Sequence, residues 1–265
     1  MTVIAAIGHL TLDVVADAAP RPGGGVFYAA RALARLGADA RIAASCAAGD
    51  RPALVPPLEA FGLPVTWHES TMTTAYSFHY EGDRRIMRQD AIGDPWTPAD
   101  AIAGAGDAEW VDVGALVRTD FSPEALTALA AGGQRLLVDA QGLIRIPTIG
   151  ALQTDGDIGD ALRHVEILKL DDQEAKTLLG SADPERLHEL GVPEVLLTLG
   201  SEGSFVVTPD LIEHVAAVEV DGPVDPTGAG DTFSVAYLTR RADGAEPVEA
   251  ARAAAATVAA FLAKP

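Results

Sequence analysis

Residues 224–233 read VDPTGAGDTF, a glycine-containing turn that leads directly into an apolar run ending near Arg240. The apolar run predicts a helix, and the turn places Gly228, Ala229 and Gly230 at its start. The first N–H groups of a helix have no partner inside the helix, and the helix dipole adds partial positive charge there. The stretch therefore predicts an anion-binding site at a helix N-terminus.

Asp231 follows these glycines directly and would lie beside a bound anion. A phosphoryl group in transfer needs donors for its equatorial oxygens, and a neighbouring carboxylate can accept the proton of an attacking hydroxyl. The alternative is structural, because an Asp after a glycine turn is often a helix cap. The residues alone leave both interpretations open.

Around this stretch, short apolar runs typical of strands alternate with Ala- and Leu-rich runs typical of helices. Such alternation predicts one α/β domain, residues 1–265, with a mainly parallel sheet and helices on both faces. Two final helices follow the last strands. The expected strands are 3–7, 40–44, 110–113, 136–139, 167–170, 204–207 and 212–220, and the expected earlier helices are 26–36, 53–61, 122–131 and 159–164.

Residues 65–88 interrupt this pattern, because they alternate in polarity and are rich in Thr, Tyr, Phe and His. With a turn at 81–83, they predict an antiparallel hairpin. A hairpin inserted between parallel units would stand off the main sheet, so we expect a small β lid at about 65–90. A hairpin at the sheet edge without such a role is the alternative.

The composition excludes several partners. Of 265 residues, 48% are hydrophobic, which supports a substantial core, and the formal charge is −19. That charge would repel polyphosphate backbones and anionic membrane surfaces, so we expect neither nucleic acid nor a membrane as partner. The single cysteine, Cys46, fits a reducing compartment, and the apolar start lacks the basic residues of a signal peptide. We expect a cytoplasmic protein.

The stretch DPTGAGDTF resembles the C-terminal signature of the ribokinase-like (phosphofructokinase B) carbohydrate kinases. The resemblance implies a three-layer ribokinase-like fold with a small β lid, ATP and Mg²⁺ as cofactors, and phosphorylation of a hydroxyl of a sugar or cyclic polyol. It also implies that Asp231 is the catalytic base and that the amides of Gly228, Ala229 and Gly230 form an anion hole.

Two N-terminal elements extend the resemblance. Asp13 follows the first strand, where the family places a carboxylate that binds substrate hydroxyls, and residues 23–37 resemble the family's Gly-Gly element and its helix. Tyr28 stands where ribokinase has a sugar-binding Asn, which argues against ribose. The expected substrate-binding residues here are Asp13, Gly24, Gly25 and Tyr28.

Asp171 and Glu174 stand three apart at a helix start and so share a face. They resemble the family's Asn-x-x-Glu motif, which organises Mg²⁺ and the phosphates largely through water, with Asp replacing Asn. The alternative is an acidic first turn that satisfies the helix dipole. The expected metal residues are Asp171 and Glu174, and the expected nucleotide contacts are Lys169, Thr198, Gly200, Gly203 and Thr227.

Residues 84–88 and 139–145 resemble the inositol- and nucleoside-kinase-like branch of the family more than ribokinase. Arg88 and Arg145 in these segments are candidates for contacts with substrate or ATP, because a guanidinium binds phosphate bidentately. Between Asp13 and Gly23 there is room for a short connection only, so the expected lid lacks a first hairpin. A nucleoside remains the alternative acceptor.

The resemblance leaves further questions open. The chain ends after its last helix, without the family's terminal segment, so the enclosure of adenine and a dependence on a monovalent cation (K⁺) stay open. A monomer and a homodimer are both compatible with one short hairpin. A non-catalytic descendant that binds sugar or nucleotide is the alternative function.

Other nucleotide-dependent classes fit less well. A dinucleotide-dependent oxidoreductase needs a third glycine where Tyr28 stands, and its glycines should follow the first strand directly. Neither the Gly-x-x-x-x-Gly-Lys-Ser/Thr element nor the protein-kinase motif set is present. The sequence therefore favours a small-molecule kinase of the ribokinase-like kind.

Overall fold

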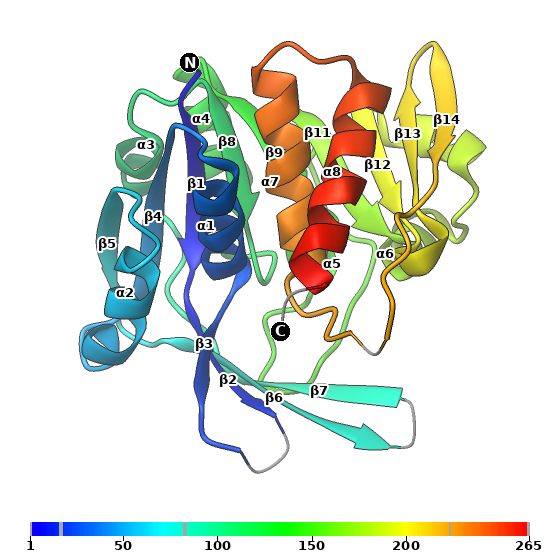
Figure 1. The fold of residues 1–265 in the computed structure, drawn as a ribbon. Coiled ribbons are helices and arrows are strands. Elements are labelled where there is room, and N and C mark those ends of the chain that lie inside the picture. Colours follow the sequence, from blue (N-terminus) through cyan, green and yellow to red (C-terminus); the bar gives the residue numbers. More distant parts are fainter. Residues whose placement is uncertain (1, 16–17, 82–83, 223, 264–265) are drawn as a thin grey trace.

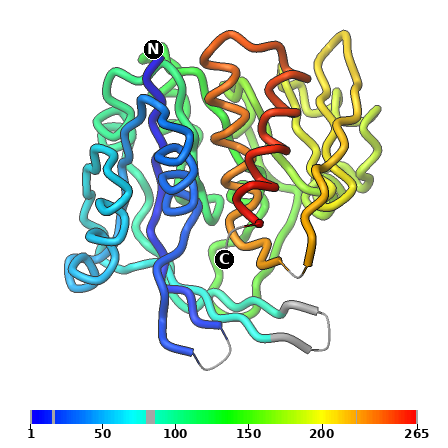
Figure 2. The backbone as a smooth tube through the Cα atoms, in the orientation of Figure 1, coloured from blue at the N-terminus to red at the C-terminus, as the bar shows by residue number. Residues whose placement is uncertain are grey.

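A nine-stranded sheet runs through the molecule in the order β14-β13-β12-β11-β9-β8-β1-β4-β5 (Figure 1). The computed structural model describes residues 2–15, 18–81, 84–222 and 224–263, traced from end to end in Figure 2. The pairs from β5 to β12 are parallel, whereas β13 and β14 are antiparallel to their neighbours. The strands are β1 (Ile4–His9), β4 (Ala40–Ala47), β5 (Val65–Ser70), β8 (Trp110–Gly114), β9 (Arg135–Asp139), β11 (Val165–Asp171), β12 (Glu194–Thr198), β13 (Ser204–Thr208) and β14 (Leu211–Val215).

Helices cover both faces of this sheet, because successive strand residues point to opposite sides. Ala6 is buried on one face, whereas Ala5 and Ile7 are buried on the other. The first face carries α1 (Gly25–Leu36), α2 (Arg51–Glu59), α7 (Ala229–Ala242) and α8 (Pro247–Leu262), and the second carries α3 (Pro98–Ala105), α4 (Pro123–Ala131), α5 (Ala140–Ile144), α6 (Asp172–Leu179) and η1 (Pro184–Leu190). This confirms the expected three-layer α/β architecture. None of the described helices has the length and apolar character needed to cross a membrane.

A second, five-stranded sheet, called the small sheet below, stands off the carboxyl ends of the parallel strands (Figure 1). The structure corrects two expectations about it. Residues 65–70 form β5 in the main sheet, paired with β4, so only the later part of 65–88 is a hairpin. A short antiparallel pair also forms between Asp13 and Gly23, where only a connection was expected. The strands are β2 (Thr11–Val15), β3 (Arg21–Gly23), β6 (Thr74–Glu81), β7 (Arg84–Ala91) and β10 (Gly150–Ala151).

The helix expected at 159–164 is wrong, because this segment forms successive turns. Its amides bond three residues back, from Ala161 to the carbonyl of Ile158 and from Arg163 to that of Asp160. The α5 helix lies earlier, at Ala140–Ile144, and starts where Asp139 accepts the N–H of Gln141 at 3.0 Å. The expected turn at 81–83 includes residues 82–83, which lie outside the described residues.

Glu194 in β12 binds two side chains of α7 and so connects this helix to the sheet. Its carboxylate, 6% exposed, accepts hydrogen bonds from Tyr237 and Arg241 of α7, with Arg241 Nη2 at 3.0 Å from Oε2. We expect Glu194→Ala to lower the free energy of unfolding by about 3 to 5 kcal/mol, because the guanidinium loses its buried partner.

Urea unfolding measures this loss against a matched control. The Glu213 carboxylate pairs with Arg252 at 3.8 Å, and the two side chains are 45% and 66% exposed. Such surface pairs contribute less than about 1 kcal/mol, so Glu213→Ala should be nearly neutral. Equal losses in the two variants would contradict a structural role for the Glu194 contacts.

Candidate active site

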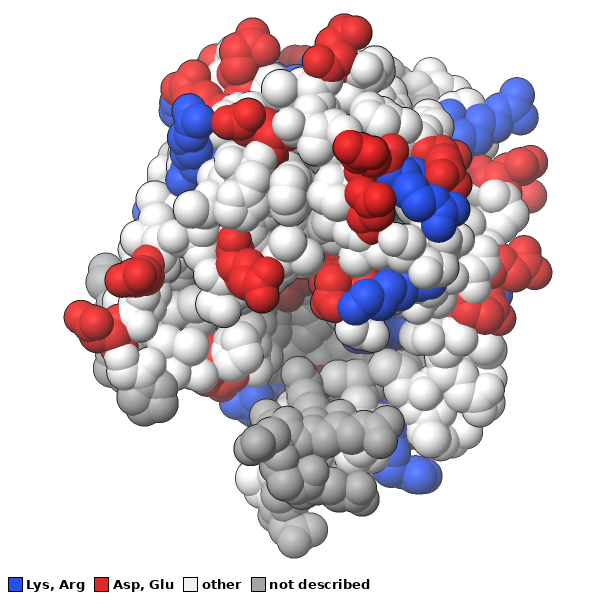
Figure 3. Space-filling model, turned by 90° about the vertical axis from the view of Figure 1, so that its right-hand side faces the viewer, with Lys and Arg blue, Asp and Glu red and all other residues white. Residues whose placement is uncertain are grey.

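A cavity of about 230 Å³ lies between the carboxyl edge of the main sheet and the small sheet. In Figure 3 a hollow opens in the lower half of the molecule, with acidic and basic side chains beside it. The cavity brings together most of the site residues expected from the sequence. Its lining is Thr11, Asp13, Gly24, Gly25, Tyr28, Tyr76, Phe78, Met87, Leu116, Asp139, Gln141, Arg145, Lys169, Pro226, Thr227, Gly228, Gly230 and Asp231.

The start of α7 forms one wall. Gly228 caps the helix with a φ of 79°, a left-handed conformation that favours glycine, and its Cα side packs against the Tyr28 ring without room for a Cβ. The Ala229 N–H donates to the Pro226 carbonyl at 3.0 Å, so this turn already uses one of the three amides expected to bind an anion. The N–H groups of Gly228 and Gly230 have no acceptor among the described residues.

Asp231 lies in the first turn of α7 and faces this cavity. Gly25 makes room for it from α1, since a Cβ at that position would come 2.9 Å from Asp231 Oδ1. Burial, reinforced by the negative charge of Asp139, raises the pKa of Asp231 to about 6, while Lys169 and Arg145 act in the opposite direction. The carboxylate is therefore ionised at neutral pH and still basic enough to take a proton.

Lys169 supplies a buried positive charge beside the amides. It is 6% exposed, its Nζ lies 2.9 Å from Asp139 Oδ2, and a Cβ on Gly230 would come 3.1 Å from Nζ. Burial alone would lower the pKa of Lys169, but Asp139, Glu174 and Asp231 raise it, so the ammonium stays charged. Asp139 was not among the residues predicted for the site, although it opens the 139–145 segment that the sequence singled out.

The opposite wall offers groups for a polar acceptor. Asp13 in β2 is 8% exposed and accepts a hydrogen bond from Thr11 Oγ1 at 2.7 Å. Arg145 donates to Gln141 Oε1 at 2.7 Å and lies 5.9 Å from the centre of the Tyr76 ring. Aromatic and apolar side chains of β6 and β7 complete the wall. They were not predicted as site residues, because the only sequence feature that marks them is the alternating polarity of these two strands. These side chains are Tyr76, Phe78 and Met87.

Besides Ala229, whose amide the turn uses, six predicted site residues lie outside the cavity lining. Arg88 is one, because it alternates with Met87 along β7 and is exposed, with Nε 3.9 Å from Asp90. The other group gathers at the ends of β11 and β12, where Thr198 pairs with Asp171 in the strand register. That group consists of Asp171, Glu174, Thr198, Gly200 and Gly203.

Asp171 and Glu174 form a capping box at the start of α6. Asp171 Oδ1 accepts the Glu174 N–H at 2.8 Å, and Glu174 Oε2 accepts the Asp171 N–H at 2.7 Å. Among the described residues, no three Asp, Glu, His or Cys side chains converge as ligands for a metal ion. The second oxygen of each carboxylate stays outside the box, which fits an ion such as Mg²⁺ that takes its other ligands from water and phosphate. Burial and the charge of Asp139 raise the pKa of Glu174, and a cation would relieve that crowding.

The layered sheet, the small sheet across its carboxyl edge and the helix N-terminus beside Asp231 define the ribokinase fold. The chain belongs to the pfkB family of carbohydrate kinases, whose family model matches residues 6–265.

Solved structures of the same fold extend over nearly the whole chain. A pyrophosphate-dependent kinase in the ribokinase family, complexed with a pyrophosphate analog and myo-inositol, is 25% identical. That match covers 99% of this chain and 96% of the other, with a TM-score of 0.85. Arabidopsis thaliana ribokinase complexed with ribose and ATP is 18% identical, with coverages of 98% and 92% and a TM-score of 0.74.

Sequence relatives match shorter segments. A ribokinase from Arabidopsis thaliana is 34% identical over 110 residues, which is 37% of this chain and 28% of that protein. A nucleoside kinase from Methanothermobacter thermautotrophicus is 37% identical over 82 residues, 31% of this chain and 26% of that protein. The chain thus matches about a quarter of the length of these relatives.

Proposed function

We propose that this protein is a kinase that transfers a phosphoryl group to a hydroxyl of a sugar or cyclic polyol, with Asp231 as the base. The observation that carries the proposal is the juxtaposition in one cavity of Asp231, the free amides of Gly228 and Gly230, and the Lys169 ammonium. A carboxylate able to take a proton thus lies beside donors suited to a phosphoryl group.

In this mechanism, Asp13 orients the acceptor and Asp231 accepts the proton of the attacking hydroxyl. Its oxygen bonds to the terminal phosphorus while the bridging P–O bond of the donor breaks, which releases ADP from ATP or phosphate from pyrophosphate. The amides of Gly228 and Gly230 and the Lys169 ammonium bind the oxygens of the phosphoryl group, on which negative charge spreads during transfer. Mg²⁺, when bound near Asp171 and Glu174, would neutralise charge on the donor phosphates. The small sheet is the lid of the site in this proposal, since Tyr76, Phe78 and Met87 bring apolar surface that excludes water from the transfer.

The proposed donor is MgATP, and pyrophosphate is a second candidate. Lys169, Thr227 and the free amides lie in the cavity lining and suit the terminal phosphates of either donor. Thr198, Gly200 and Gly203, expected to contact the nucleotide, lie outside that lining, and the pyrophosphate-dependent relative matches 99% of the chain. These two observations favour a test of pyrophosphate beside ATP.

The proposed acceptor is a sugar or cyclic polyol. Asp13 and Arg145 offer partners for several hydroxyls, and the relative complexed with myo-inositol makes inositol the first compound to test. Tyr28, Tyr76 and Phe78 could equally stack on a base, so nucleosides are the alternative acceptor.

A matrix of two donors and several acceptors tests the function. Initial rates are measured with MgATP or with magnesium pyrophosphate against inositols, pentoses, hexoses and nucleosides. We expect phosphorylated product with at least one polyol or sugar. Product with nucleosides alone would assign the alternative acceptor. Binding of donor and acceptor without any product would favour the non-catalytic descendant and reject the proposal.

The rate of phosphoryl transfer should depend on pH with an acid limb. Asp231 must be ionised to accept a proton, and its pKa is raised to about 6. We expect kcat/KM to fall about tenfold per pH unit below about pH 6 and to level off above about pH 7. A pH–rate profile measures this, and the residual activity of Asp231→Asn should lack that limb. A wild-type profile that stays flat to about pH 5 would contradict the assignment.

A further inference from the structure

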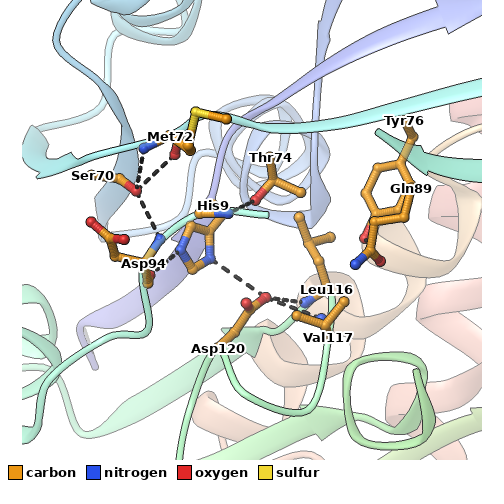
Figure 4. A network of polar contacts seen from close by, with 11 residues as sticks. His9, Ser70, Met72, Thr74, Tyr76, Gln89, Asp94, Leu116, Val117 and Asp120 are labelled. Atoms are coloured by element: carbon orange, nitrogen blue, oxygen red, sulfur yellow. Dashed lines mark hydrogen bonds and ion pairs between the residues drawn. The ribbon is translucent and has the colours of Figure 1, made fainter. Parts of the chain in front are cut away.

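A buried histidine that the proposed chemistry does not use lies where the main sheet meets the small sheet. His9 ends β1, is 0% exposed, and is followed after one residue by β2 of the small sheet. Figure 4 shows its ring between two partners from distant parts of the chain. Nε2 lies 2.8 Å from the Asp94 carbonyl oxygen, and Nδ1 lies 3.5 Å from Asp120 Oδ2.

Asp94 connects the two segments that run between the main sheet and the small sheet, called crossings below: residues 71–73, between β5 and β6, and residues 92–94, after β7. Asp94 follows β7, and its N–H donates to Ser70 Oγ at 2.8 Å at the end of β5. Its carboxylate accepts the N–H and the hydroxyl of Thr71, each at 2.7 Å. The neighbouring Gly93 N–H donates to Thr74 Oγ1 at 2.9 Å, at the start of β6. His9 thus links the connection between β1 and β2 to the segment that enters β6 and the segment that leaves β7.

The Asp120 side leads to the cavity. Asp120 Oδ2 accepts the N–H of Leu116 at 2.7 Å and that of Val117 at 3.1 Å, and Leu116 lines the cavity. Gly24 lines it too, and its α-carbon packs against the His9 carbonyl without room for a Cβ. A shift of His9 would therefore move the cavity wall as well as the small sheet.

Two contacts favour the charged form of the ring: the hydrogen bond of Nε2 with Asp94, and the Asp120 carboxylate 3.5 Å from Nδ1, a buried nitrogen with no hydrogen-bond partner among the described residues. The Asp94 carbonyl only accepts, so Nε2 must carry a proton. A neutral ring would then turn the lone pair of Nδ1 toward the Asp120 carboxylate, whereas an imidazolium turns an N–H toward it. Burial lowers the pKa of His9, but the charge of Asp120 and the contacts with Asp94 outweigh burial and raise it above 6.5. Asp120 and Asp94 are the charged groups that act on the ring, and Trp96 meets it edge-on, 6.2 Å between ring centres.

We propose that His9, as an imidazolium paired with Asp120, is a positioning residue that fixes the small sheet and the Leu116 wall relative to the acceptor site. Its effect on activity rests on the proposed function, whereas its effect on the small sheet does not. The charge is the active feature, because a neutral ring would face Asp120 with a lone pair. Loss of that charge should therefore loosen the crossings without touching the groups that bind the phosphoryl group.

Two variants and a control separate charge from packing. Asp120→Asn keeps a carbonyl oxygen for the amides of Leu116 and Val117 and removes the negative charge, while His9→Gln keeps a donor for the Asp94 carbonyl and removes the positive one. His68→Gln is the matched control, because His68 also packs against Trp96, 4.7 Å between ring centres, but its carboxylate partner is Asp100, 3.8 Å from Nδ1. We expect both test variants, but not the control, to exchange the amide hydrogens of β6 and β7 at least about tenfold faster.

Hydrogen exchange in the full chain tests the role of His9 whether or not the protein is a kinase. In wild type, the protection of β6 and β7 should be full at pH values below 6.5 and fall as the pH rises through the raised pKa of His9, whereas in Asp120→Asn it should be low throughout. Where transfer is measurable, the acceptor KM should rise about tenfold with kcat within about twofold. Wild-type exchange in Asp120→Asn would overturn the proposal, and so would equal effects in His68→Gln. If His9→Gln does not fold, Asp120→Asn alone decides.

Discussion

Replacement of Asp231 by Asn is expected to lower kcat by about 10²- to 10⁴-fold, the usual contribution of a general base. The amide has the size of the carboxylate and can keep the first turn of α7, but it cannot accept the proton of the attacking hydroxyl. Because Gly228, Gly230 and Lys169 remain, the variant should still bind donor and acceptor. Steady-state rates with the preferred donor and acceptor, together with calorimetric binding, measure the two effects separately.

Asp112 provides the matched control for this substitution. It lies on the sheet face under α7, is 6% exposed, and burial together with Asp231 and Asp139 raises its pKa well above the usual value. Asn has nearly the size of Asp and carries no charge, and burial already disfavours the charged form of Asp112, so Asp112→Asn should change kcat by less than about threefold. A large loss of kcat in both variants would mean that Asp231 acts through the combined charge of Asp112, Asp139 and Asp231 and not as the base. Full activity of Asp231→Asn would remove it as the base.

Loss of the Lys169 ammonium should affect both catalysis and stability. Lys169→Met removes a buried cation beside Gly230 and should lower kcat by about 10²- to 10³-fold, as loss of one donor to a transition-state oxyanion does. It also leaves the Asp139 carboxylate, whose side chain is 15% exposed, without its partner at 2.9 Å. Because this unpaired charge is mostly buried, we expect the free energy of unfolding to fall by about 3 to 5 kcal/mol. Urea unfolding and steady-state kinetics measure both.

The double variant Lys169→Met/Asp139→Asn separates these two effects. Removal of both charges eliminates the unpaired carboxylate, so stability should return to near the wild-type value while kcat stays low. Recovery of activity together with stability would show that Lys169 serves only as the partner of Asp139. The single variant Asp139→Asn should shift the acid limb of the pH profile below about 6, because Asp139 raises the pKa of Asp231.

The parts of the fold that depend on local pattern could be predicted from the sequence. The start of α7 follows from the glycines before Asp231, because a left-handed cap at Gly228 is a local feature. The two helical layers follow from the alternation of strand-like and helix-like runs along the chain, and strands such as β1 are apolar on both sides because their residues face opposite cores. The expected parallel sheet is confirmed for these reasons.

The parts that depend on distant pairing could not be predicted in the same way. Residues 65–70 have the polarity of an exposed hairpin strand, yet they pair with β4 at the edge of the main sheet. Lys169 and Asp139 meet only because they are register partners on β11 and β9. The Ala229 N–H donates to the Pro226 carbonyl within a turn, and the sequence alone does not show that this turn closes. His9 gains its partners at the meeting point of several crossings.

Whether this protein transfers phosphoryl groups with Asp231 as base is decided by the phosphorylated acceptor itself, detected by mass spectrometry after incubation of the protein with a donor and the acceptor mixture. MgATP and magnesium pyrophosphate are supplied in separate reactions, and Asp231→Asn is run in parallel with both. We expect the wild-type protein to add one phosphate to a polyol or sugar, and the variant to form about 10²- to 10⁴-fold less product. Equal amounts of product from both proteins, or bound ligands without product in wild type, would contradict it.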